Sequence, residues 1–418
     1  MYSTLFIRFI TFFTLITIIS VSADKVKCPP INSTESDVAQ KRYIVFVSND
    51  EVHYKWLKDC YNRPVQSIKT KKQPVDKHSI LDISIKGKFL AYITWYYPEF
   101  AEKHLKGRPE IISVEEDSPV KLLKSSKFVT VQNNPPLNLD RIDQVNFPLN
   151  NKYIFPSSAG SCATVYVVDT GVLVTHEEFE GRASHLGSFC SGCVDTDDNG
   201  HGTHVAAIIG GKTFGVAKKV KIFSVKVFDY RGSGSFADVI AGLSFVLADV
   251  MSRNNKNNAI INMSLGGGIN QALNDMVKIL TDEGIHVVVA AGNDASNASN
   301  TSPASVLSAI TVGATEDVSN SITDFSNFGE CLDIFAPGRN IKSAGIQSNT
   351  DTAVFSGTSQ ATSHVAGTVA LIMSKCGNQK PDKMVTTLIK ISTKNILFNT
   401  FGSPNNFLRI PYGNKYKC

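Results

Sequence analysis

The stretch VKIFSVKVFDYRGSGSFADVIAGLSFVLADV, residues 220–250, decides the fold class. It begins with an apolar run rich in β-branched residues (220–228) and passes through a turn made of Gly and Ser. The spacing of apolar residues then predicts a helix over 237–250, with one apolar face formed by Val239, Ile240, Leu243, Val246, Leu247 and Val250. A buried strand followed by an amphipathic helix is the unit that builds parallel sheets covered by helices.

The same pattern recurs along the chain. Apolar strand runs occur at 163–168 (ATVYVV), 259–265 (AIINMSL), 285–291 (IHVVVAA) and 309–314 (AITVGA), and helix-like segments separate them. The sequence therefore predicts an α/β fold with three layers around a parallel sheet. An active site in such a fold is expected at the carboxyl ends of the strands.

The chain upstream of this region has a different pattern of apolar residues. Residues 43–122 contain YIVFV, FLAYITW, a helix-like PEFAEKHLKG and IISVEEDSPV, which predict a small α+β unit. The polar segment KSSKFVTVQNNPPLNL, residues 124–139, contains a Pro pair and is typical of an exposed, cleavable linker.

The N-terminus carries a targeting segment. Residues 1–23 contain a single Arg, an apolar stretch from Phe9 to Val21 and a small-residue cleavage site ending at Ala23, which predict a signal peptide and a secreted, extracellular protein. A membrane anchor is the alternative, but it needs about 20 apolar residues and Arg8 interrupts this stretch. Residues 24–42 are polar.

Composition narrows the possible partners. The chain has 418 residues with 42% apolar content, enough for a large core, and Lys and Arg exceed Asp and Glu by 42 − 37 = 5. These charges are scattered, so no nucleic acid partner is predicted. Since no other segment is long and apolar enough, we also expect no membrane span after signal removal.

Eight cysteines lie beyond the signal peptide. An even number in an oxidising compartment favours disulfides over free thiols, although the pairing cannot be read from the sequence. Cys190 and Cys193, in CSGC, are expected to bond to each other or to distant cysteines. Glycosylation sequons begin at Asn32, Asn297 and Asn300, whereas the sequon at Asn262 lies in an apolar run and is expected to be buried.

Three motifs carry chemistry. VVDTGV places Asp169 at the end of an apolar strand, NGHGTHVAAIIGG places His201 where a loop enters a helix, and FSGTSQATSHVAGTVALIM places Ser359 where another helix begins. A serine hydroxyl becomes nucleophilic when a neutral imidazole accepts its proton, and a carboxylate must hold that imidazole in the correct tautomer. The free amides at a helix N-terminus also favour the anion that acyl transfer creates.

A zinc site is the competing interpretation of this region. It would use Cys190, Cys193, His201 and His204, but the gaps between these residues are shorter than zinc-finger spacing, and the chain has no HExxH motif. We therefore interpret His201 as the base and His204, one helical turn later, as a structural residue.

In the order Asp, His, Ser, the motifs DTGV, HGTHVA and GTSQATSHVAG resemble the subtilisin-like serine proteases. Within that family, SLGGG, AAGN, SPAS and FSNFG…LDIFAPG are most similar to the proteinase K group, and the likeness runs from about Gln132 to about Cys376. Residues 43–122 resemble the inhibitory propeptide of the family through YIVFV and VEED, which implies a ferredoxin-like unit.

The resemblance implies a monomeric endopeptidase that acts on proteins and peptides and is made as a zymogen. Its own propeptide would be an intramolecular inhibitor, removed by a cut between about Ser125 and Val131, within a processing linker at 123–131. The peptidase domain would span 132–418. Carried over by motif, Asp169 orients the imidazole, His201 is the general base and acid, and Ser359 is the nucleophile. Asn293, in AAGN, would donate its side-chain amide to the oxyanion.

The resemblance also implies where substrate binds. A peptide would be held as an added strand. It would lie between Gly232, Ser233 and Gly234 on one side and Ser264, Leu265, Gly266 and Gly267 on the other. The walls of the S1 pocket, Leu265 to Gly268 and Ala290, Ala291 and Gly292, are small and uncharged, which predicts broad or apolar P1 residues.

No cofactor is required for this chemistry, but a structural calcium ion is possible. Asp333, in LDIFAP, with the carbonyls of Leu307 and Ala309, resembles a calcium site of the proteinase K group. The alternative is that Asp333 is an ordinary acid at a strand end.

Several positions depart from the family. Gln360 stands where Met is usual, and Ser363 replaces a usual Pro, so a shifted helix is the largest change expected. Cys162 matches a family cysteine whose partner is missing here, and the family's second bridge lacks its cysteine at ITVGA. Cys28 and Cys60 are expected to pair with each other.

Two other functions are possible. A catalytically inactive subtilase fold could be a binding module, although all three catalytic residue types and Asn293 are present. An α/β-hydrolase esterase would need GxSxG and the order Ser, Asp, His, and the chain has neither around Ser359.

Overall fold

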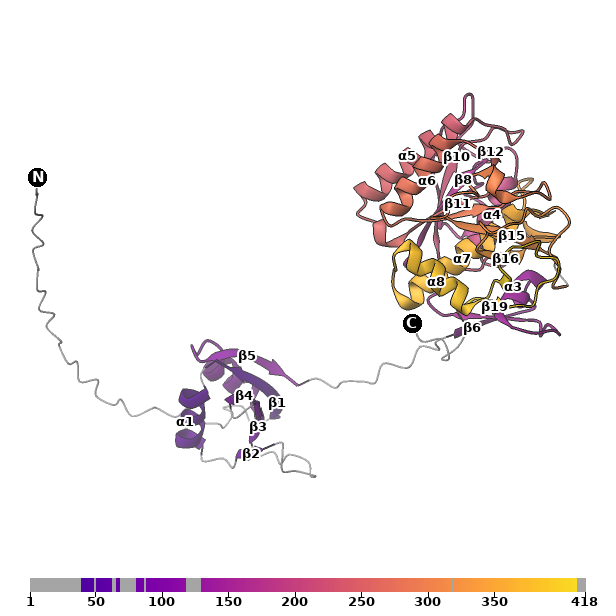
Figure 1. Ribbon diagram of the computed structural model, residues 1–418. Helices are drawn as coiled ribbons and strands as arrows, with labels where there is room; N and C mark the ends of the chain where they lie inside the picture. The colour runs from indigo at the N-terminus through magenta and orange to yellow at the C-terminus, as the bar shows by residue number, and fades with distance from the viewer. Residues whose placement is uncertain are drawn as a thin grey trace, which may run out of the picture. The chain divides into compact units, whose positions relative to one another are not determined.

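The computed structural model describes residues 39–411 except 49, 62–64, 68–79, 86–87, 118–128 and 317–318. The chain divides into two compact units, Met1–Leu123 and Lys124–Cys418 (Figure 1). The predicted signal peptide, Cys28, Asn32, the linker residues 123–128 and Cys418 lie outside the described residues.

A nine-stranded sheet forms the centre of the C-terminal unit, in the order β19-β20-β16-β15-β13-β11-β8-β10-β9. All neighbouring strands are parallel except β19 and β20. The five predicted strand runs are present as β8 (Thr164–Asp169), β10 (Lys221–Lys226), β11 (Ala259–Met263), β13 (His286–Ala290) and β15 (Ile310–Thr315). The sheet is completed by β9 (Ala183–Ser188), β16 (Ile334–Pro337), β19 (Thr393–Lys394) and β20 (Asn406–Phe407). The predicted α/β class is therefore confirmed.

Helices cover both faces of this sheet. One core contains α4 (His201–Gly210), α7 (Thr358–Cys376) and α8 (Pro381–Ile391), and the other contains α5 (Phe236–Ser252) and α6 (Gln271–Asp282) (Figure 1). Alternate residues of β8 enter opposite cores: Val165 and Val167 pack with α4 and α7, whereas Tyr166 and Val168 pack with α5 and α6. Burial on both faces explains why the strands are apolar without alternation.

The predicted helix over 237–250 is α5. Val239, Leu243, Val246 and Val250 are buried on its inner face, while Ile240 and Leu247 are partly buried against the same core. Ser235 caps the helix in a capping box with Asp238, which explains why the helix begins directly after the Gly and Ser turn.

The segment 124–139 is not an open linker over its whole length. From Val129 it forms β6 (Val129–Asn133), which pairs antiparallel with β7 (Lys152–Pro156), and then α3 (Leu137–Asp143). Its polar composition suggested a loop, but a short strand at the edge of a domain also tolerates polar residues. Short elements elsewhere in the unit are β12 (Gly267–Gly268), β14 (Thr301–Ser302), β17 (Ile341–Ala344), β18 (Thr352–Phe355) and the 3₁₀ turns η3 (Glu177–Phe179), η4 (Lys256–Asn258) and η5 (Ala298–Asn300).

The N-terminal unit is a small α+β sheet, as predicted. Its strands run in the order β2-β3-β4-β1-β5, with β1 (Lys41–Val47), β2 (Val65–Ser67), β3 (Ile80–Ile85), β4 (Lys88–Tyr96) and β5 (Ile111–Glu116). The predicted helix near 98–107 is α2 (Pro98–Phe100) continued by the short π-helix η2 (Ala101–Leu105). Helix α1 (Asp50–Tyr61) was not predicted from the sequence, although its buried His53, Trp56 and Leu57 recur at helical spacing.

The cysteines behave in two ways. Cys190 and Cys193 form a disulfide with each other. Cys60 is disulfide-bonded, and so is Cys376. Cys162 and Cys331 are free thiols, so the expectation that the even number of cysteines would favour disulfides is wrong for these two. A disulfide requires two cysteines with Cα atoms within about 7 Å, a condition that spacing in the sequence does not guarantee. In the described residues we find no helix with both the length and the apolar character needed to cross a membrane.

Candidate active site

The three predicted catalytic residues sit at the ends of secondary structure elements. Asp169 is the last residue of β8, His201 is the first residue of α4, and Ser359 is the second residue of α7. The first turn of α4 approaches the loop after β8 so closely that a Cβ on Gly202 would lie 2.0 Å from the carbonyl oxygen of Gly171. Only glycine permits this approach, which brings His201 against Asp169.

His201 and Asp169 form a hydrogen-bonded pair. Nδ1 of His201 lies 2.8 Å from Oδ1 and 3.0 Å from Oδ2 of Asp169, which is fully buried. The His201 side chain is 29% exposed. Burial opposes a charged imidazole, but the charge and hydrogen bond of Asp169 outweigh it and raise the pKa of His201 above 6.5. This geometry places the ring proton on Nδ1 and leaves Nε2 free to accept one.

Ser359 has a different partner in this structure. Its Oγ donates to the carbonyl oxygen of Ser264 at 3.2 Å, while Oγ of Ser264 donates to the carbonyl oxygen of Ser359 at 2.9 Å. The structure therefore does not place the Ser359 hydroxyl in a hydrogen bond with His201. Hydrogen bonds between catalytic groups are often long or misaligned without substrate and form when it binds.

Two adjoining hollows form one cleft that contains His201, Ser359 and Asn293. A hollow of about 620 Å³ is lined by Asn293, Thr358, Ser359 and the predicted S1 residues Leu265, Gly266, Gly267, Gly268, Ala290 and Gly292. A second, of about 560 Å³, is lined by His201, Asn199, Phe228, Arg231 and the predicted residues Gly232, Ser233 and Gly234. Ser264, Leu265 and Gly266 line both hollows. Ala291 lines neither, because its side chain is buried in the core.

The carboxamide of Asn293 has a defined orientation. Its Oδ1 accepts from the backbone N–H of Thr358 at 2.8 Å and from the Thr358 hydroxyl at 2.9 Å. Because its oxygen is used in this way, its Nδ2 group is left to donate at the exposed side, in the cleft that also contains Ser359.

Asp197 is important to the site but was not singled out from the sequence. Its carboxylate accepts hydrogen bonds from the hydroxyls of Thr170 and Thr203 and from the backbone N–H groups of Gly200 and Thr203. These bonds tie the loop before His201 to the residue after Asp169. The acidic run DTDDN was the available signal, but only the contacts distinguish Asp197 from its neighbours.

Asp294 is a second residue that the sequence analysis missed. It lines the hollow that contains Ser359, among small and uncharged residues. The predicted uncharged S1 walls are therefore accompanied by one acid.

The structure gives His204 a structural place. It is buried, its Nε2 lies 3.0 Å from the carbonyl oxygen of Ile341, and its ring stacks on Phe355 with centroids 4.5 Å apart. Burial lowers the pKa of His204 to about 4. The Cys190 and Cys193 sulfur atoms are bonded to each other and so are not thiolate ligands. Within the parts of the chain that the structure describes, no group of three or more His, Cys, Asp or Glu side chains could hold a metal ion.

Asp333, the candidate calcium ligand, lies just before β16. Its Oδ2 accepts from the backbone N–H of Thr311 at 2.9 Å, and burial raises its pKa to about 6. Among the described residues it forms no ion pair with Lys, Arg or His. Leu307 is exposed and Ala309 is buried.

The helix that carries Ser359 is unbroken. Helix α7 runs from Thr358 to Cys376 through Ser363, whose Oγ donates to the carbonyl oxygen of Ser359 at 2.8 Å. Nε2 of Gln360 lies 3.5 Å from Nδ1 of His204. Neither departure from the family pattern interrupts the helix.

Comparisons with known proteins identify the family of the chain. A model of the subtilase family matches residues 160–407. The chain is 42% identical over 306 residues to a cuticle-degrading protease of Metarhizium anisopliae, covering 73% of this chain and 76% of that protein. It is 39% identical over 370 residues to alkaline protease 1 of Aspergillus flavus, covering 87% and 89%. The crystal structure of a cold adapted subtilisin-like serine proteinase matches with a TM-score of 0.63 and 41% identity, over 67% of this chain and all of the other.

Proposed function

Because the chain belongs to the subtilase family and is a subtilisin-like serine endopeptidase, we propose that it cleaves proteins through Asp169, His201 and Ser359. The observation that carries this proposal is the pair formed by His201 and the buried Asp169, in a cleft that Ser359 and Asn293 also line.

The reaction proceeds through an acyl-enzyme. The Ser359 hydroxyl turns from the Ser264 carbonyl to His201, Nε2 takes its proton, and Oγ attacks the scissile carbonyl carbon. The carbonyl oxygen becomes an oxyanion that accepts hydrogen bonds from Nδ2 of Asn293 and from the backbone N–H of Ser359. When the C–N bond breaks, the imidazolium returns the proton to the leaving amine. Water then releases the acyl group by the same proton route in reverse order.

The peptide binds as an extended strand between residues 232–234 and 264–267. Both segments line the cleft that His201 also lines. Residues 265–268 continue into the hollow beside Ser359. Small and apolar walls suit apolar P1 side chains, and the carboxylate of Asp294 disfavours acidic ones. A peptide library should therefore give cleavage mainly after apolar or aromatic residues. A profile dominated by Arg and Lys would overturn this preference.

The protein is secreted as a zymogen. Residues 1–23 are the signal peptide, 43–122 are the inhibitory propeptide, 123–131 are the processing linker and 132–418 are the peptidase domain. The cut lies between about Ser125 and Val131, and the pairing of β6 with β7 from Val129 onward favours the part before that strand.

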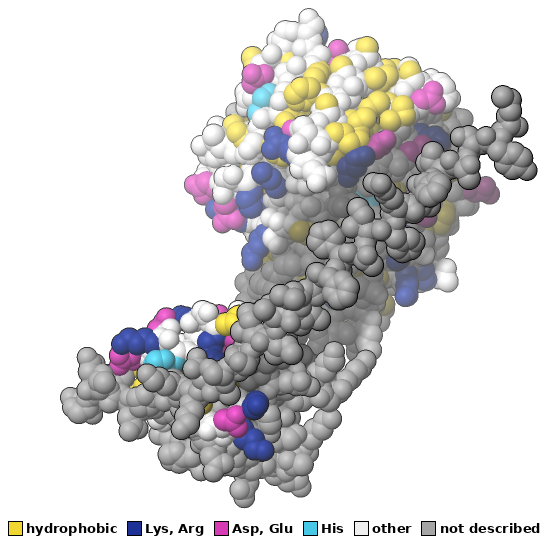
Figure 2. All heavy atoms as spheres, turned by 90° about the vertical axis from the view of Figure 1, so that its left-hand side faces the viewer, with side chains coloured by type: hydrophobic (Ala, Val, Ile, Leu, Met, Phe, Trp, Pro, Cys, Tyr) yellow, Lys and Arg dark blue, Asp and Glu magenta, His cyan; other side chains and the backbone are white. Residues whose placement is uncertain are grey.

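Both units carry exposed apolar residues. In the N-terminal unit, Phe46 and Ile112 are exposed on β1 and β5; in the C-terminal unit, Phe245, Met251 and Ile279 are exposed on α5 and α6. Figure 2 shows apolar side chains gathered on the face of the C-terminal unit that carries α5 and α6. Such patches often mark interaction surfaces.

N-terminal sequencing of purified protein tests the proposal. The wild type should begin inside the processing linker, whereas Ser359→Ala should retain the propeptide and begin after the signal peptide. A fluorophosphonate should label the wild type only. Unlabelled wild type with an intact propeptide would instead support the inactive binding module.

A bound calcium ion is a separate proposal. Asp333 carries a half-buried carboxylate whose pKa is raised by burial and whose described surroundings contain no cationic partner, so its environment fits a cation held with the carbonyls of Leu307 and Ala309. Calcium would stabilise the fold and take no part in the chemistry. A chelator should lower the melting temperature of the wild type but not that of Asp333→Asn. An unchanged wild-type melting temperature would remove calcium from the proposal.

A further inference from the structure

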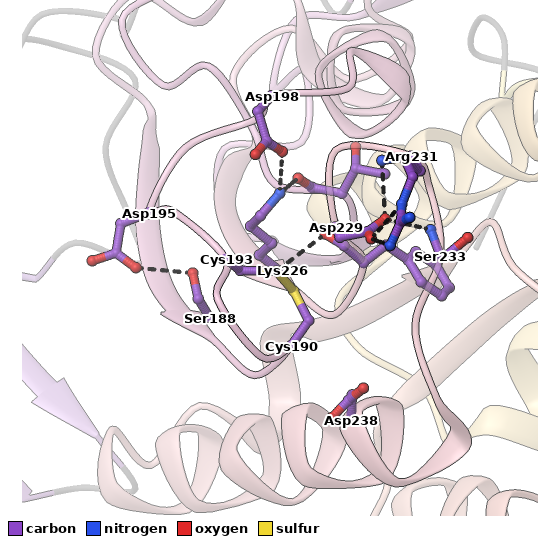
Figure 3. The surroundings of a disulfide bond; sticks show 12 residues. Ser188, Cys190, Cys193, Asp195, Asp198, Lys226, Asp229, Arg231, Ser233 and Asp238 are labelled. Atoms are coloured by element: carbon purple, nitrogen blue, oxygen red, sulfur yellow. Dashed lines mark hydrogen bonds and ion pairs between the residues drawn. A yellow bond between two sulfur atoms is a disulfide. The ribbon is translucent and has the colours of Figure 1, made fainter.

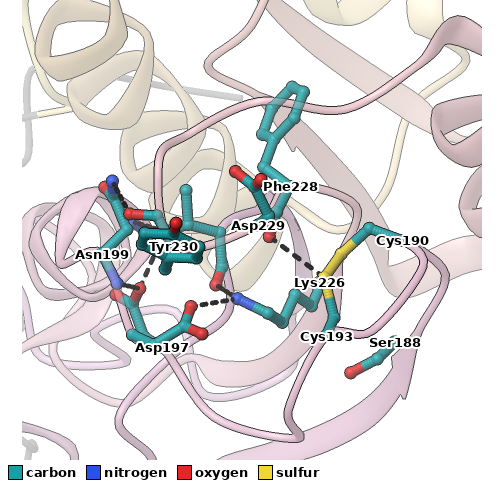
Figure 4. A network of polar contacts seen from close by, with 12 residues as sticks. Ser188, Cys190, Cys193, Asp197, Asn199, Lys226, Phe228, Asp229 and Tyr230 are labelled. Carbon is teal, nitrogen blue, oxygen red and sulfur yellow. Dashed lines mark hydrogen bonds and ion pairs between the residues drawn. A yellow bond between two sulfur atoms is a disulfide. The ribbon is translucent and has the colours of Figure 1, made fainter.

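A fully buried lysine lies beside the catalytic edge of the sheet. Lys226 is the last residue of β10 and pairs in register with Asp169 on β8. Its side chain has no exposed area. Its Nζ donates to Oδ1 of Asp198 at 2.6 Å and to the carbonyl oxygen of Thr170. Figure 3 shows the Lys226 ammonium group beside Asp198, and Figure 4 shows Lys226 from close by.

The two contacts of Lys226 reach the two catalytic segments. Thr170 directly follows Asp169, and Asp198 lies three residues before His201. One ammonium group therefore connects the segment that carries the orienting carboxylate to the loop that leads into the catalytic histidine. The Asp197 contacts join the same two segments, so Lys226 and Asp197 form two adjacent links.

The same loop is also attached to the wall of the cleft. The Phe189 N–H donates to the carbonyl oxygen of Lys226 at 2.8 Å. Cys193 Sγ lies 3.7 Å from the carbonyl oxygen of Phe228 (Figure 4). Asn199 Nδ2 donates to the carbonyl oxygen of Tyr230 at 3.0 Å. Lys226 thus lies where the disulfide loop, the catalytic loop and the substrate-binding segment meet.

Burial of this ion pair is expensive for the fold. An ammonium group loses its hydration when buried, and a well-packed apolar side chain of similar volume is often at least as stabilising as an ion pair. Stability alone therefore gives no reason for a lysine here. The two hydrogen bonds of Lys226 give a different reason for a lysine, because a methionine would fill the space without connecting Thr170 to Asp198.

We propose that Lys226 and Asp198 are a positioning pair that holds the His201 ring in line with Asp169 during turnover. This inference rests on the proposed function, because it concerns the reactivity of the same histidine. Neither side chain touches the reacting atoms. The pair acts through the backbone on both sides of the imidazole.

The pair also has an electrical consequence that a packing role would not have. Near His201, Asp169 and Asp197 raise its pKa, and the titratable His204 lies one helical turn later on α4. The Asp229 to Arg231 ion pair follows Lys226 in the chain. Removing only the lysine leaves Asp198 unpaired and should raise the pKa of His201. Removing only the Asp198 charge leaves a buried cation and should lower it.

Four full-length variants test the proposal, with active sites counted by fluorophosphonate: Lys226→Met, Asp198→Asn, the double variant and Asp195→Asn. Asp195 is the matched control, because it lies on the same loop, is 79% exposed and bonds to Ser188 instead of Lys226 (Figure 3). Both single variants should lose about tenfold or more in kcat per labelled site, with KM within about threefold.

The pH profiles and the double variant complete the test. The acid limb of kcat/KM should move to higher pH in Lys226→Met and to lower pH in Asp198→Asn. In the double variant it should return toward the wild-type position while kcat remains low. Asp195→Asn should match the wild type in both readouts.

The outcomes that overturn the proposal are specific. Single variants with kcat per labelled site within twofold of wild type would remove the positioning role. A double variant with wild-type kcat would show that Lys226 and Asp198 only compensate each other's charge and do not position His201. Asp198 is partly exposed, so Asp198→Asn keeps the test valid if Lys226→Met does not fold. A wild type that is neither labelled nor active would count against the proposed function instead.

Discussion

At the scale of single residues, the site depends on which atoms are already used. Nδ1 of His201 is held by Asp169, so Nε2 can accept a proton. Oδ1 of Asn293 is held by Thr358, so Nδ2 can donate a hydrogen bond. Each side chain has one end fixed by the fold and the other end available to substrate. This preorganisation is what distinguishes a catalytic cleft from a polar surface hollow.

The pH dependence of activity should follow His201. Its pKa is raised, and only the neutral ring can accept the Ser359 proton, so activity is lost as pH falls through that raised value. The acid limb of kcat/KM should therefore have a midpoint above 6.5. Asp169→Asn should lower that midpoint and reduce kcat by about 10⁴-fold, the effect known for the same exchange in another serine protease. A wild-type midpoint at or below 6.5 would contradict the assignment.

Loss of the Asn293 donor should affect the transition state more than substrate binding. We expect Asn293→Ala to lower kcat by about 10² to 10³-fold, a magnitude that comes from subtilisin itself and not from this chain, with little change in KM. Steady-state kinetics on a peptide substrate measure both constants. Asn297→Ala, whose side chain caps the turn at Ser299 outside the cleft lining, should retain wild-type kcat. Equal losses in the two variants would refute the oxyanion role.

At the scale of elements, the position of Ser359 depends on how closely α7 packs against α4. Ser363 bonds to the carbonyl oxygen of Ser359, and Ser264 bonds to the same oxygen from the end of β11. The first turn of α7 is therefore held from within the helix and from the sheet. The two helices approach closely at Gly367 of α7, where an added Cβ would lie 3.1 Å from the carbonyl oxygen of Ile209 in α4.

Gly367 tests the importance of this close packing. A Cβ at this position would lie 2.6 Å from Cβ of Val216 and 3.1 Å from the carbonyl oxygen of Ile209. Gly367→Ala should destabilise the fold by about 1–3 kcal/mol and lower its melting temperature. Gly268→Ala is the control for stability, because a Cβ there would meet no atom within 4 Å. Equal melting temperatures in the two variants would show that the helices can separate without cost.

At the scale of the whole molecule, the two units can be distinguished by their tryptophan fluorescence. The chain has only two tryptophans, Trp56 and Trp95, and both belong to the N-terminal unit. Tryptophan fluorescence of the uncut protein therefore follows the unfolding of that unit alone, while the larger unit contributes no tryptophan signal.

The N-terminal unit should lose stability in mild acid. His53 is buried between Trp56 and Tyr92, and burial lowers its pKa below 6.5 although the nearby Glu110 opposes the shift. The folded unit therefore binds fewer protons than the unfolded one. The contribution of neutral His53 to the stability of the unit is fully present above about pH 6.5, the unperturbed pKa of histidine. It is lost as the pH falls toward the lower pKa of His53 in the folded unit.

The measurement uses Ser359→Ala, which stays uncut. Its tryptophan-detected melting temperature should fall between pH 7 and pH 5. Adding His53→Phe, which keeps an aromatic ring between Trp56 and Tyr92, should flatten that dependence. The same slope with and without His53 would assign the acid sensitivity to another group.

The sequence by itself determined the fold class and the chemical parts. Strands buried on both faces leave continuous apolar runs, and helices covering them leave a 3.6-residue period, so residues 220–250 already predicted a parallel sheet with helices. The motifs around Asp169, His201 and Ser359 are local, and a local pattern survives in the linear chain.

Only the tertiary structure decided which polar groups meet. Several features all depend on residues distant in the chain: the hydrogen bonds of Asp197 and Lys226, the free thiols of Cys162 and Cys331, the acid at Asp294 and the pairing of β6 with β7. Burial and hydrogen bonding act through space, so an acidic run or a lone lysine looks the same in sequence whether it is solvated or enclosed. That is why the sequence suffices to propose Asp169, His201 and Ser359 as the catalytic residues, whereas the contacts around them appear only in the folded chain.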